Sequence, residues 1–316
     1  HLLSRRQRQM CIRDRNTYII ELNHLSKSFK DVKAVDDLSF KVKAGELFAF
    51  LGLNGAGKST TIHIMCGQLA KDSGEVLIDG KSIDTNLNDV KRSLGVVFQN
   101  SVLDAPLSVY DNLYSRVSLY GFSKKEFEEK LQSLANLLDF KTLLKRPYGK
   151  LSGGQKRKID IARALFHDPK VLILDEPTTG LDPQTRKKVW EVINHLRKEK
   201  GITIFLTTHY MEEASDADNV IILDKGKIVA SGSPIELKNK YTGDFIIFYH
   251  TPLEEIQKLN LPLEIGTGFI RVAIENPKIA TELIIKYPEV FHDYEITKGK
   301  MDDVFLAATG KTLGGN

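Results

Sequence analysis

The sequence predicts an α/β protein with a largely parallel sheet, followed by a smaller α+β module. From Tyr18 to Pro234 short apolar strands alternate with helical periods, which is typical of α/β domains. The strands predicted at 47–52, 171–175 and 202–207 are apolar along most of their length. Strands that are covered on both faces of a parallel sheet have this pattern. After Pro234 short strands and helices follow one another in a different order, which marks the second module.

A buried strand is predicted at Leu47–Gly52, and the helix after it is predicted from Gly57-Lys58 to about Leu69. The region 105–150 differs because it is rich in leucine and poor in strand signals. Four of its leucines have helical spacing: Leu131, Leu134, Leu137 and Leu138. We therefore expect a helical subdomain, at about 100–165, inserted into the α/β core.

Later signals complete the first part. Asp182 and Pro183 supply an N-cap and a first-turn proline for a helix, and Gly201 ends that helix. The run Asp224-Lys225-Gly226 lies between two apolar strands and predicts a hairpin.

The second module follows the linker-like residues 238–240. Its predicted elements are a strand at 245–249, a helix at 252–260, strands across 263–274, a helix at 277–287 and a strand at 290–297. This order is compatible with a ferredoxin-like βαββαβ arrangement, and a short helix at Met301–Ala308 closes it. We expect one domain at 16–237 and an accessory domain at 238–316.

Net charge does not favour a nucleic-acid partner. The chain has 316 residues, a formal net charge of +4 and a sequence pI of about 8.8. Residues 1–15 hold five arginines and one acid, Asp14. The other residues are balanced, since the whole chain has 45 Lys and Arg against 41 Asp and Glu. A neutral remainder gives no global attraction to phosphate backbones, so no nucleic acid is expected.

The arginine-rich start requires its own interpretation. An organellar targeting peptide is one alternative, but residues 1–15 lack an amphipathic period with serine enrichment. The run from Met10 to Asp14 resembles the translation of a transposon-end adapter used in sequencing libraries. We therefore expect a non-native leader, and we exclude it from the fold argument.

The number of cysteines indicates the redox state of the compartment, and the length of the apolar runs indicates whether the chain itself can span a membrane. Two cysteines, Cys11 and Cys66, are too few for a disulfide framework and favour a reducing compartment. The longest apolar runs, such as Val171–Leu174 and Phe245–Tyr249, are far shorter than the roughly 18–20 residues that span a bilayer. Any membrane role is therefore expected to act through a partner.

A phosphate-binding loop is the strongest motif. The pattern G-x-x-x-x-G-K-[ST], extended by one residue, is matched by Gly52, Leu53, Asn54, Gly55, Ala56, Gly57, Lys58, Ser59 and Thr60. Glycines allow backbone N–H groups to curl around phosphate oxygens, and the helix N-terminus adds a positive dipole. Lys58 would reach the β- and γ-phosphates, and the Ser59 hydroxyl would bind Mg²⁺. The alternative is a glycine-rich turn with an incidental lysine.

Two carboxylates follow a buried strand. Asp175 and Glu176 come at the carboxyl end of the apolar run that begins at Val171, where α/β sheets bind ligands. Asp175 suits a Mg²⁺ shell, and Glu176 suits a base that polarises an attacking water. The alternative is a solvated loop start.

A capped helix start lies between these two motifs. It comprises Leu151, Ser152, Gly153, Gly154 and Gln155. Ser152 caps the helix and the glycines expose its first N–H groups, which is an anion site. Taken alone this is an ordinary helix start, but it lies after the phosphate loop and shortly before Asp175.

In this order, over about residues 17–235, the motifs resemble those of the ATPase subunits of ATP-binding-cassette (ABC) transporters. Residues 52–60 resemble the Walker A loop, 151–155 the signature motif, and 171–175 the Walker B strand, with Glu176 as the catalytic base. The resemblance implies a P-loop NTPase core with a parallel sheet, an antiparallel β subdomain and an inserted helical subdomain.

The resemblance also implies further site residues. Gln99 resembles the Q-loop glutamine near the metal, Leu181 and Asp182 the D-loop, and His209 the switch histidine that contacts the γ-phosphate. Phe29 resembles the aromatic residue that stacks on adenine, although the family often has tyrosine there; core packing is the alternative. The implied catalytic residues are Lys58, Glu176 and His209, and the implied metal ligands are Ser59, Gln99 and Asp175.

The function implied is ATP hydrolysis with Mg²⁺ by a homodimer or a paired ATPase subunit. Each ATP would lie between the Walker A loop of one subunit and the signature motif of the other, at the cytoplasmic face of a separate membrane permease. The stretch from Met301 to Gly310 resembles the ending of bacterial drug- and antibiotic-exporter ATPases, which favours export of drug-like or amphipathic substrates. An importer ATPase and a soluble, non-transport ABC ATPase are the alternatives.

Overall fold

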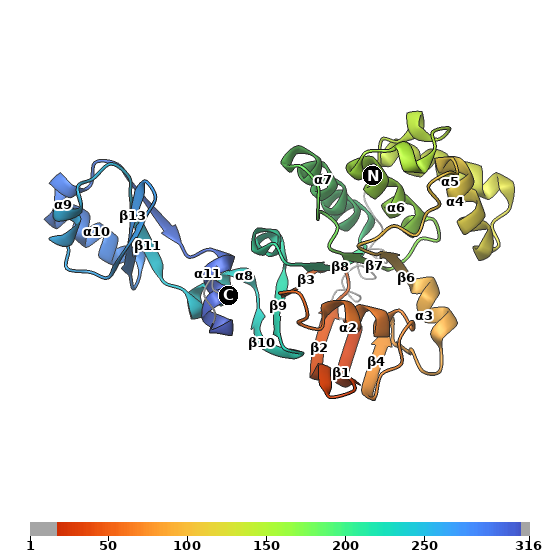
Figure 1. Cartoon of the computed structure of the whole chain (residues 1–316), viewed down its shortest axis with the longest axis horizontal. Coiled ribbons are helices and arrows are strands. Elements are labelled where there is room, and N and C mark those ends of the chain that lie inside the picture. Colours follow the sequence, from red (N-terminus) through yellow and green to blue (C-terminus); the bar gives the residue numbers. More distant parts are fainter. Residues whose placement is uncertain (1–17, 311–316) are drawn as a thin grey trace, which may run out of the picture. The chain divides into compact units, whose positions relative to one another are not determined.

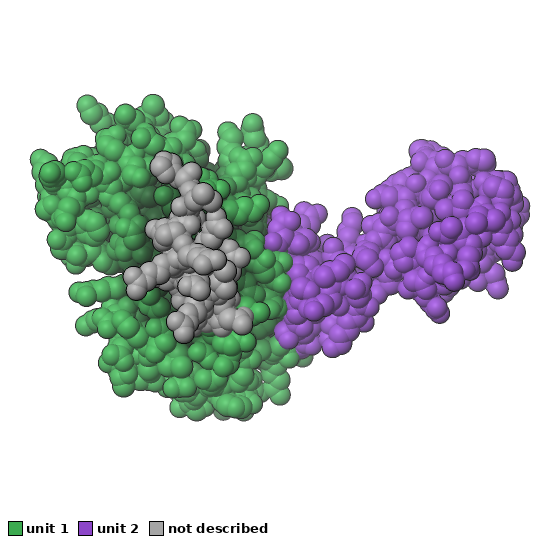
Figure 2. Space-filling model, turned by 180° about the vertical axis from the view of Figure 1, so that it is seen from behind, with its two compact units in different colours: residues 1–209, 217–228 green, residues 210–216, 229–316 purple. Residues whose placement is uncertain are grey.

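The computed structural model describes residues 18–310, so Cys11 and the interpretation of the leader lie outside the described residues. The chain forms two compact units, coloured separately in Figure 2. The first comprises the described residues up to His209 and residues 217–228. The second comprises residues 210–216 and the described residues from Val229 onward.

A parallel sheet forms the centre of the first unit (Figure 1). Its strands run in the order β9-β3-β8-β7-β6, and every neighbouring pair is parallel. They are β3 (Leu47–Gly52), β6 (Leu94–Val97), β7 (Val171–Asp175), β8 (Thr203–Thr208) and β9 (Asn219–Asp224). β3, β7 and β8 are buried at every position, as expected for strands that are covered on both faces.

The predicted hairpin follows β9. Lys225 and Gly226 both have positive φ, 47° and 79°, which is the turn geometry that joins twisted antiparallel strands. β10 (Lys227–Gly232) begins after this turn, and the chain passes into the second unit within it.

An antiparallel sheet completes the first unit. Its order is β2-β1-β4-β5, from β1 (Tyr18–Phe29), β2 (Val32–Lys43), β4 (Ser73–Ile78) and β5 (Lys81–Ser82). Phe40 from this sheet stacks on Phe48 and Phe205 of the parallel sheet, with ring centroids 5.4 and 6.1 Å apart. The two sheets therefore share one aromatic core.

Helices pack around these sheets, and three of them, α4, α5 and α6, lie in the range predicted for the helical subdomain. The helices of the unit are α2 (Lys58–Met65), α3 (Leu87–Ser93), α4 (Val109–Val117), α5 (Lys124–Leu137), α6 (Gly153–Leu165) and α7 (Pro183–Lys200), with the 3₁₀ turns η2 (Ser118–Tyr120), η3 (Lys141–Leu143) and η4 (Tyr148–Lys150). α2 ends at Met65, four residues before the predicted end. Gly67, with φ of 66°, adopts the left-handed conformation that terminates helices.

The second unit contains the predicted βαββαβ arrangement. Its sheet order is β12-β13-β11-β14 with antiparallel neighbours. The elements are β11 (Asp244–Phe248), α9 (Leu253–Gln257), β12 (Leu263–Gly266), β13 (Phe269–Ile274), α10 (Pro277–Lys286), η6 (Pro288–Val290), β14 (Tyr294–Lys298) and α11 (Met301–Thr309). The last strand starts at Tyr294 and not at residue 290, because Pro288–Val290 forms a 3₁₀ turn instead.

The compact units divide the chain after residue 228, nine positions before the boundary expected at 237. Two elements account for this difference: η5 (Met211–Asp216) and α8 (Pro234–Tyr241). Both pack against α11, so they belong with the C-terminal elements. Residues 238–240, expected to form a linker, lie inside α8 instead, because the Ser233 cap and Pro234 start a helix that continues through them.

Candidate active site

The phosphate loop connects β3 to α2. Gly55 and Gly57 have φ of 83° and 105°, values that only glycine adopts readily. A Cβ atom at Gly57 would lie 2.3 Å from the carbonyl oxygen of Ala34, so that position also has no room for a side chain. The loop therefore has the close backbone packing that phosphate binding requires.

Lys58 lies inside this loop. Its Nζ donates hydrogen bonds to the carbonyl oxygens of Gly52 and Leu53, at 2.6 and 3.3 Å. Burial lowers the pKa of Lys58, and the nearby carboxylates of Glu176 and Asp175 oppose that shift. The ammonium group is thus held among oxygen atoms, next to both predicted carboxylates.

Three predicted side chains meet at the carboxylate of Glu176, those of Lys58, Gln99 and His209. Oε2 accepts a hydrogen bond from Gln99 Nε2 at 3.0 Å and one from Thr179 Oγ1 at 3.2 Å. Oε1 lies 3.2 Å from His209 Nδ1 and 3.9 Å from Lys58 Nζ. The structure therefore brings Lys58, Gln99, Glu176 and His209 together from segments far apart in the sequence. Thr179 is a further contact that the sequence analysis did not predict.

Asp175 lies beside this cluster at the end of β7. It is buried, and its Oδ1 accepts a hydrogen bond from Thr207 Oγ1 at 2.5 Å. Ser59 and Gln99 would add a hydroxyl and an amide oxygen to its carboxylate, and oxygen donors suit Mg²⁺. Residues 18–310 contain no cluster of three or more His, Cys, Asp or Glu that could hold a metal. Mg²⁺ in phosphate-transfer sites needs only one or two carboxylates plus substrate phosphates, so this donor set fits.

The predicted signature motif starts α6. Ser152 Oγ accepts from the Gln155 backbone N–H at 3.3 Å, and Gln155 Oε1 accepts from the Ser152 N–H at 3.1 Å. These bonds form a capping box. In the described part of the chain the Ser152 side chain bonds only within this box, and the Ser152 carbonyl oxygen accepts from the Lys156 N–H at 2.9 Å, so none of these bonds reaches the Glu176 cluster.

The D-loop residues lie against that helix start. Asp182 is the N-cap of α7, and its carboxylate accepts from the backbone N–H and the hydroxyl of Thr185 at 2.9 and 2.6 Å. A Cβ atom at Gly154 would lie 2.1 Å from Thr185 Cγ2, and one at Gly153 would lie 3.2 Å from Leu181 Cδ2. Both glycines therefore allow a close approach between the signature and D-loop segments.

Phe29 ends β1 and does not pack in the core. Its side chain is 48% exposed, and Lys27 Nζ lies 5.7 Å from the ring centroid. The core-packing alternative is wrong, because the β1–β2 turn carries the ring away from the aromatic core.

Arg157 on α6 is a site residue that the sequence reasoning missed. Its buried guanidinium donates to the carbonyl oxygens of Phe98 at 2.8 Å, Glu176 at 2.6 Å and Pro177 at 2.6 Å. Burial lowers its pKa, although nearby acids, Asp160 first among them, oppose this. The available signal was its position one helical turn before Ile161, which places a basic residue on the apolar face of the helix.

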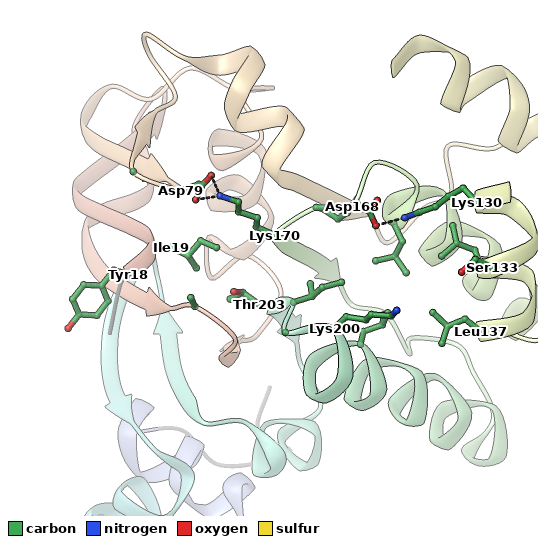
Figure 3. Close-up of a pocket in the computed structure, with 18 of the residues that line it drawn as sticks. Tyr18, Ile19, Asp79, Lys130, Ser133, Leu137, Asp168, Lys170, Lys200 and Thr203 are labelled. Carbon is green, nitrogen blue, oxygen red and sulfur yellow. Dashed lines mark hydrogen bonds and ion pairs between the residues drawn. The ribbon is translucent and has the colours of Figure 1, made fainter. Parts of the chain in front are cut away.

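A separate cavity of about 750 Å³ lies at the end of the parallel sheet where β7 and β8 begin (Figure 3). Lys170 and Thr203, at the amino ends of β7 and β8, contribute to its lining. Lys170 is paired with Asp79 at 2.7 Å, and Lys130 with Asp168. The predicted nucleotide motifs lie at the carboxyl ends of these strands, so this cavity is not the nucleotide site.

The fold and the geometry of this site together define the class of protein. A phosphate loop between a parallel strand and a helix, with carboxylates at the end of a second parallel strand, is the site of a P-loop ATPase. Among residues 18–310, every helix is either too short or too polar to span a bilayer.

Comparison with known proteins then identifies the family. Residues 35–179 match the ABC transporter family. The chain is 34% identical over 309 residues to the Nod factor export ATP-binding protein I of Rhizobium sp. (strain N33), covering 93% of this chain and 98% of that protein. The chain therefore belongs to the family of ABC transporter ATP-binding proteins, and the predicted resemblance is confirmed.

A second relative is longer than this chain. The probable multidrug ABC transporter ATP-binding protein YbhF of Escherichia coli (strain K12) is 38% identical over 226 residues. The match covers 72% of this chain but only 39% of YbhF, so the chain spans about two fifths of that relative's length.

Solved structures agree with the fold. The chain is similar to cbiO1 from Clostridium perfringens, part of the ABC transporter complex cbiONQ, with a TM-score of 0.65 and 33% identity over 70% of this chain and 90% of that one. It is also similar to the ATP-binding cassette MJ0796, solved as a dimer in a post-hydrolysis state with ADP and Pi. That match has a TM-score of 0.62 and 26% identity over 68% of this chain and 98% of that one.

Proposed function

We propose that this chain is the ATP-binding and ATP-hydrolysing subunit of an exporter, and that it energises a separate membrane permease from the cytoplasmic side. The observation that carries the proposal is the meeting of Lys58, Gln99 and His209 at the Glu176 carboxylate. We assign hydrolysis to the domain expected at 16–237 and an accessory role to 238–316.

In this proposal Glu176 is the general base. Its carboxylate accepts a proton from a water as that water attacks the γ-phosphate, a role worth about 10²- to 10⁴-fold in rate. Gln99 and Thr179 donate hydrogen bonds to Oε2 and so orient the carboxylate, while Oε1 lies on the side of Lys58 and His209. His209 and Lys58 would stabilise the negative charge of the γ-phosphate.

Nucleotide and metal would be held by the loop and the strand end. Residues 52–60 would bind the phosphates through backbone N–H groups and Lys58, and Phe29 would stack on the adenine. Ser59, Gln99 and Asp175 would hold Mg²⁺. The metal would neutralise phosphate charge when bound.

A dimer completes the proposed site. The signature residues 151–155 present the N-terminus of α6, where exposed N–H groups and the helix dipole attract anions. We propose that Ser152 and Gly154 of one subunit close over the γ-phosphate bound to the other, with the D-loop residues Leu181 and Asp182 at the same interface. The similar cassette MJ0796 was solved as a dimer bound to ADP and Pi, which supports a dimeric state for this chain.

Export of drug-like or amphipathic substrates is supported by the relatives. Nod factor export proteins match 93% of this chain, including the C-terminal module, and YbhF is named as a multidrug protein. An importer subunit or a soluble, non-transport ATPase are the alternatives. Co-purification with a membrane protein of several spans, and ATP-dependent efflux from vesicles containing both, would support export. ATPase activity with no such partner would favour the non-transport alternative.

The test of hydrolysis is Glu176→Gln in the purified chain. The variant should bind ATP like the unchanged chain but release phosphate at least 100-fold more slowly, because an amide cannot accept the proton. Glu191→Gln on the exposed face of α7 is the matched control and should hydrolyse normally. Near-normal phosphate release from Glu176→Gln would remove Glu176 as the base.

A further inference from the structure

Gln99 lies in a segment that has no regular structure of its own. β6 ends at Val97, and residues 98–107 form neither helix nor strand. The Gln99 side chain nevertheless reaches the Glu176 carboxylate, with Nε2 3.0 Å from Oε2. Connecting segments are more mobile than helices and strands. The position of Gln99 is therefore fixed by contacts that other elements make with this segment.

The first of these contacts lies on the amino side of Gln99. The Arg157 guanidinium donates a hydrogen bond to the carbonyl oxygen of Phe98 at 2.8 Å. The Phe98 ring also stacks on His63, with ring centroids 5.7 Å apart. A segment that is held on one side alone can still rotate about that point, so a second contact is needed beyond Gln99.

Asp160 supplies this second contact. Its Oδ1 accepts a hydrogen bond from Ser101 Oγ at 2.6 Å, and Ser101 Oγ accepts in turn from the Leu103 N–H at 3.2 Å. Ser101 is two residues after Gln99, so the two Cα atoms are separated by at most about 7 Å. The chain is thus held close to Gln99 on both sides.

The Asp160 carboxylate is itself fixed inside the protein. It is 5% exposed, and its Oδ2 accepts a hydrogen bond from the buried Tyr148 hydroxyl at 3.1 Å. Burial raises the pKa of Asp160, and the hydrogen bond from Ser101 is the largest of the interactions that oppose this shift. Because a buried carboxylate without donors is costly, the two hydroxyl groups fix its orientation.

One helix carries both contacts. Arg157 and Asp160 are three residues apart on α6 and therefore lie on the same face of that helix. Arg157 also donates to the backbone carbonyl oxygen of Glu176 at 2.6 Å. α6 thus holds the Gln99 segment at two points and the backbone of Glu176 at a third, so it sets the geometry between the two side chains.

We propose that Asp160 is a positioning residue for ATP hydrolysis: its carboxylate holds Ser101, and Ser101 keeps Gln99 at the Glu176 carboxylate. Gln99 Nε2 then donates to Oε2 and fixes the direction of the carboxylate. This inference rests on the proposed role of Glu176 as the base, and it adds the contact that keeps the carboxylate oriented.

The first test measures kcat and KM for ATP with the full chain, with its permease present where hydrolysis requires one. Asp160→Ala would leave two hydroxyl groups without their acceptor and destabilise the fold, so the contact is broken from its exposed side, with Ser101→Ala. This variant should lower kcat about 10- to 100-fold, because small misplacements of a catalytic group have effects of this size. KM should change by less than about twofold, since the phosphate loop is untouched. An unchanged kcat would overturn the inference.

Two further variants show whether the hydroxyl group is the cause. Ser101→Thr keeps the hydroxyl and should retain most of the activity; a loss as large as that of Ser101→Ala would contradict the inference. Ser115→Ala is the matched control, because Ser115 is also exposed and its hydroxyl donates to the carbonyl oxygen of Asn112 within α4, at 3.1 Å. This control should leave kcat and KM unchanged.

A double-mutant cycle with Gln99→Ala tests whether Asp160 and Ser101 act through Gln99. If they do, Ser101→Ala should reduce kcat little further in the Gln99→Ala background. An equal fold-loss in both backgrounds would overturn the inference while leaving the proposed function intact. Full activity of Gln99→Ala would overturn the inference as well, whereas normal hydrolysis by Glu176→Gln would contradict the proposed function itself.

Nuclear magnetic resonance of the Gln99 side-chain amide supplies a readout that does not depend on activity. Its Nε2 resonance, assigned by its absence from Gln99→Ala, should move in Ser101→Ala and in Asp160→Asn, which offers one acceptor oxygen to two hydroxyl donors. It should keep its position in Ser115→Ala. Thermal unfolding should remain cooperative in all of these variants. An unmoved Gln99 resonance would show that Asp160 does not position Gln99, and the inference would be wrong.

Discussion

The Arg157 guanidinium donates a hydrogen bond to the backbone carbonyl oxygen of Glu176 at 2.6 Å. Glu176 has φ of 47°, in the left-handed region that residues with a Cβ atom rarely adopt. Its N–H donates to the carbonyl oxygen of Thr207 at 3.1 Å. Bonds on both sides of the residue therefore stabilise an unfavourable backbone conformation, and that conformation directs the carboxylate toward His209 and Lys58.

This relationship makes Arg157 the first target. Arg157→Lys should lower kcat about 10- to 100-fold with little change in ATP affinity, because an ammonium group cannot replace a planar fork that reaches Phe98, Glu176 and Pro177. Steady-state kinetics and nucleotide titration measure the two effects. Lys158→Met on the same helix, whose amine faces Asp139 at 3.6 Å, should behave like the unchanged chain. Weaker ATP binding by Arg157→Lys would contradict a purely orienting role.

Gly154 can be tested for a packing role apart from nucleotide contact. Gly154→Ala should lower ATPase activity, since its Cβ would lie 2.1 Å from Thr185 Cγ2. Thr185→Ser removes that methyl group but keeps the hydroxyl that bonds to Asp182. If close packing is the reason for the glycine, the pair Gly154→Ala with Thr185→Ser should recover activity. Failure of this rescue would indicate that Gly154 is needed by the nucleotide itself.

Phe29 should contribute to nucleotide affinity through its exposed ring. Phe29→Ala should raise the Kd for ATP about 5- to 150-fold, because base stacking on an aromatic ring is worth about 1–3 kcal/mol. Phe29→Tyr should bind ATP normally. Val32→Ala, directly across the strand pair and 66% exposed, is the control. Equal affinity for ATP of Phe29→Ala and the unchanged chain would show that Phe29 does not stack on the adenine.

Cys66 should be unreactive in the folded protein. Burial raises its pKa to about 12 from an ordinary value near 9, so the thiolate is scarce at pH 8. Iodoacetamide labelling, read by peptide mass spectrometry, should modify Cys66 only after denaturation. Because the folded pKa lies above the unfolded one, Cys66 favours the folded state below about pH 9, and this contribution is lost as the pH rises toward 12. Rapid labelling of the native protein at pH 8 would show that the site opens.

The strands were the most predictable part of the fold. The predicted bounds of β3 and β7 agree with the structure to the residue. In both cases a short apolar run ends at a polar or glycine residue, and that change of residue type marks the end of the strand. The end of α2 was less predictable, since the apolar period continues beyond Met65 and only the conformation of Gly67 ends the helix. Local patterns therefore locate elements better than they locate helix ends.

The candidate site was predictable where a motif is contiguous. Lys58, Glu176 and His209 were predicted by pattern and resemblance, and the structure brings them together. Their roles stay predictions. Arg157 was not found, because its partners are backbone carbonyl oxygens of distant segments, which any residue could supply. The packing of η5 on α11 left no sequence signal for the same reason: ordinary apolar residues make that contact, and only the tertiary fold brings them together.

The path of the chain between its two units has a consequence for synthesis on the ribosome. η5 emerges about 90 residues before α11, which at 5–20 residues per second is a delay of roughly 4–18 s. During that time the phosphate loop has already been translated, and β7 and β8 can pair with each other. The segment after the histidine still lacks its packing partner in this interval, so η5 reaches its final packing only once α11 has been translated.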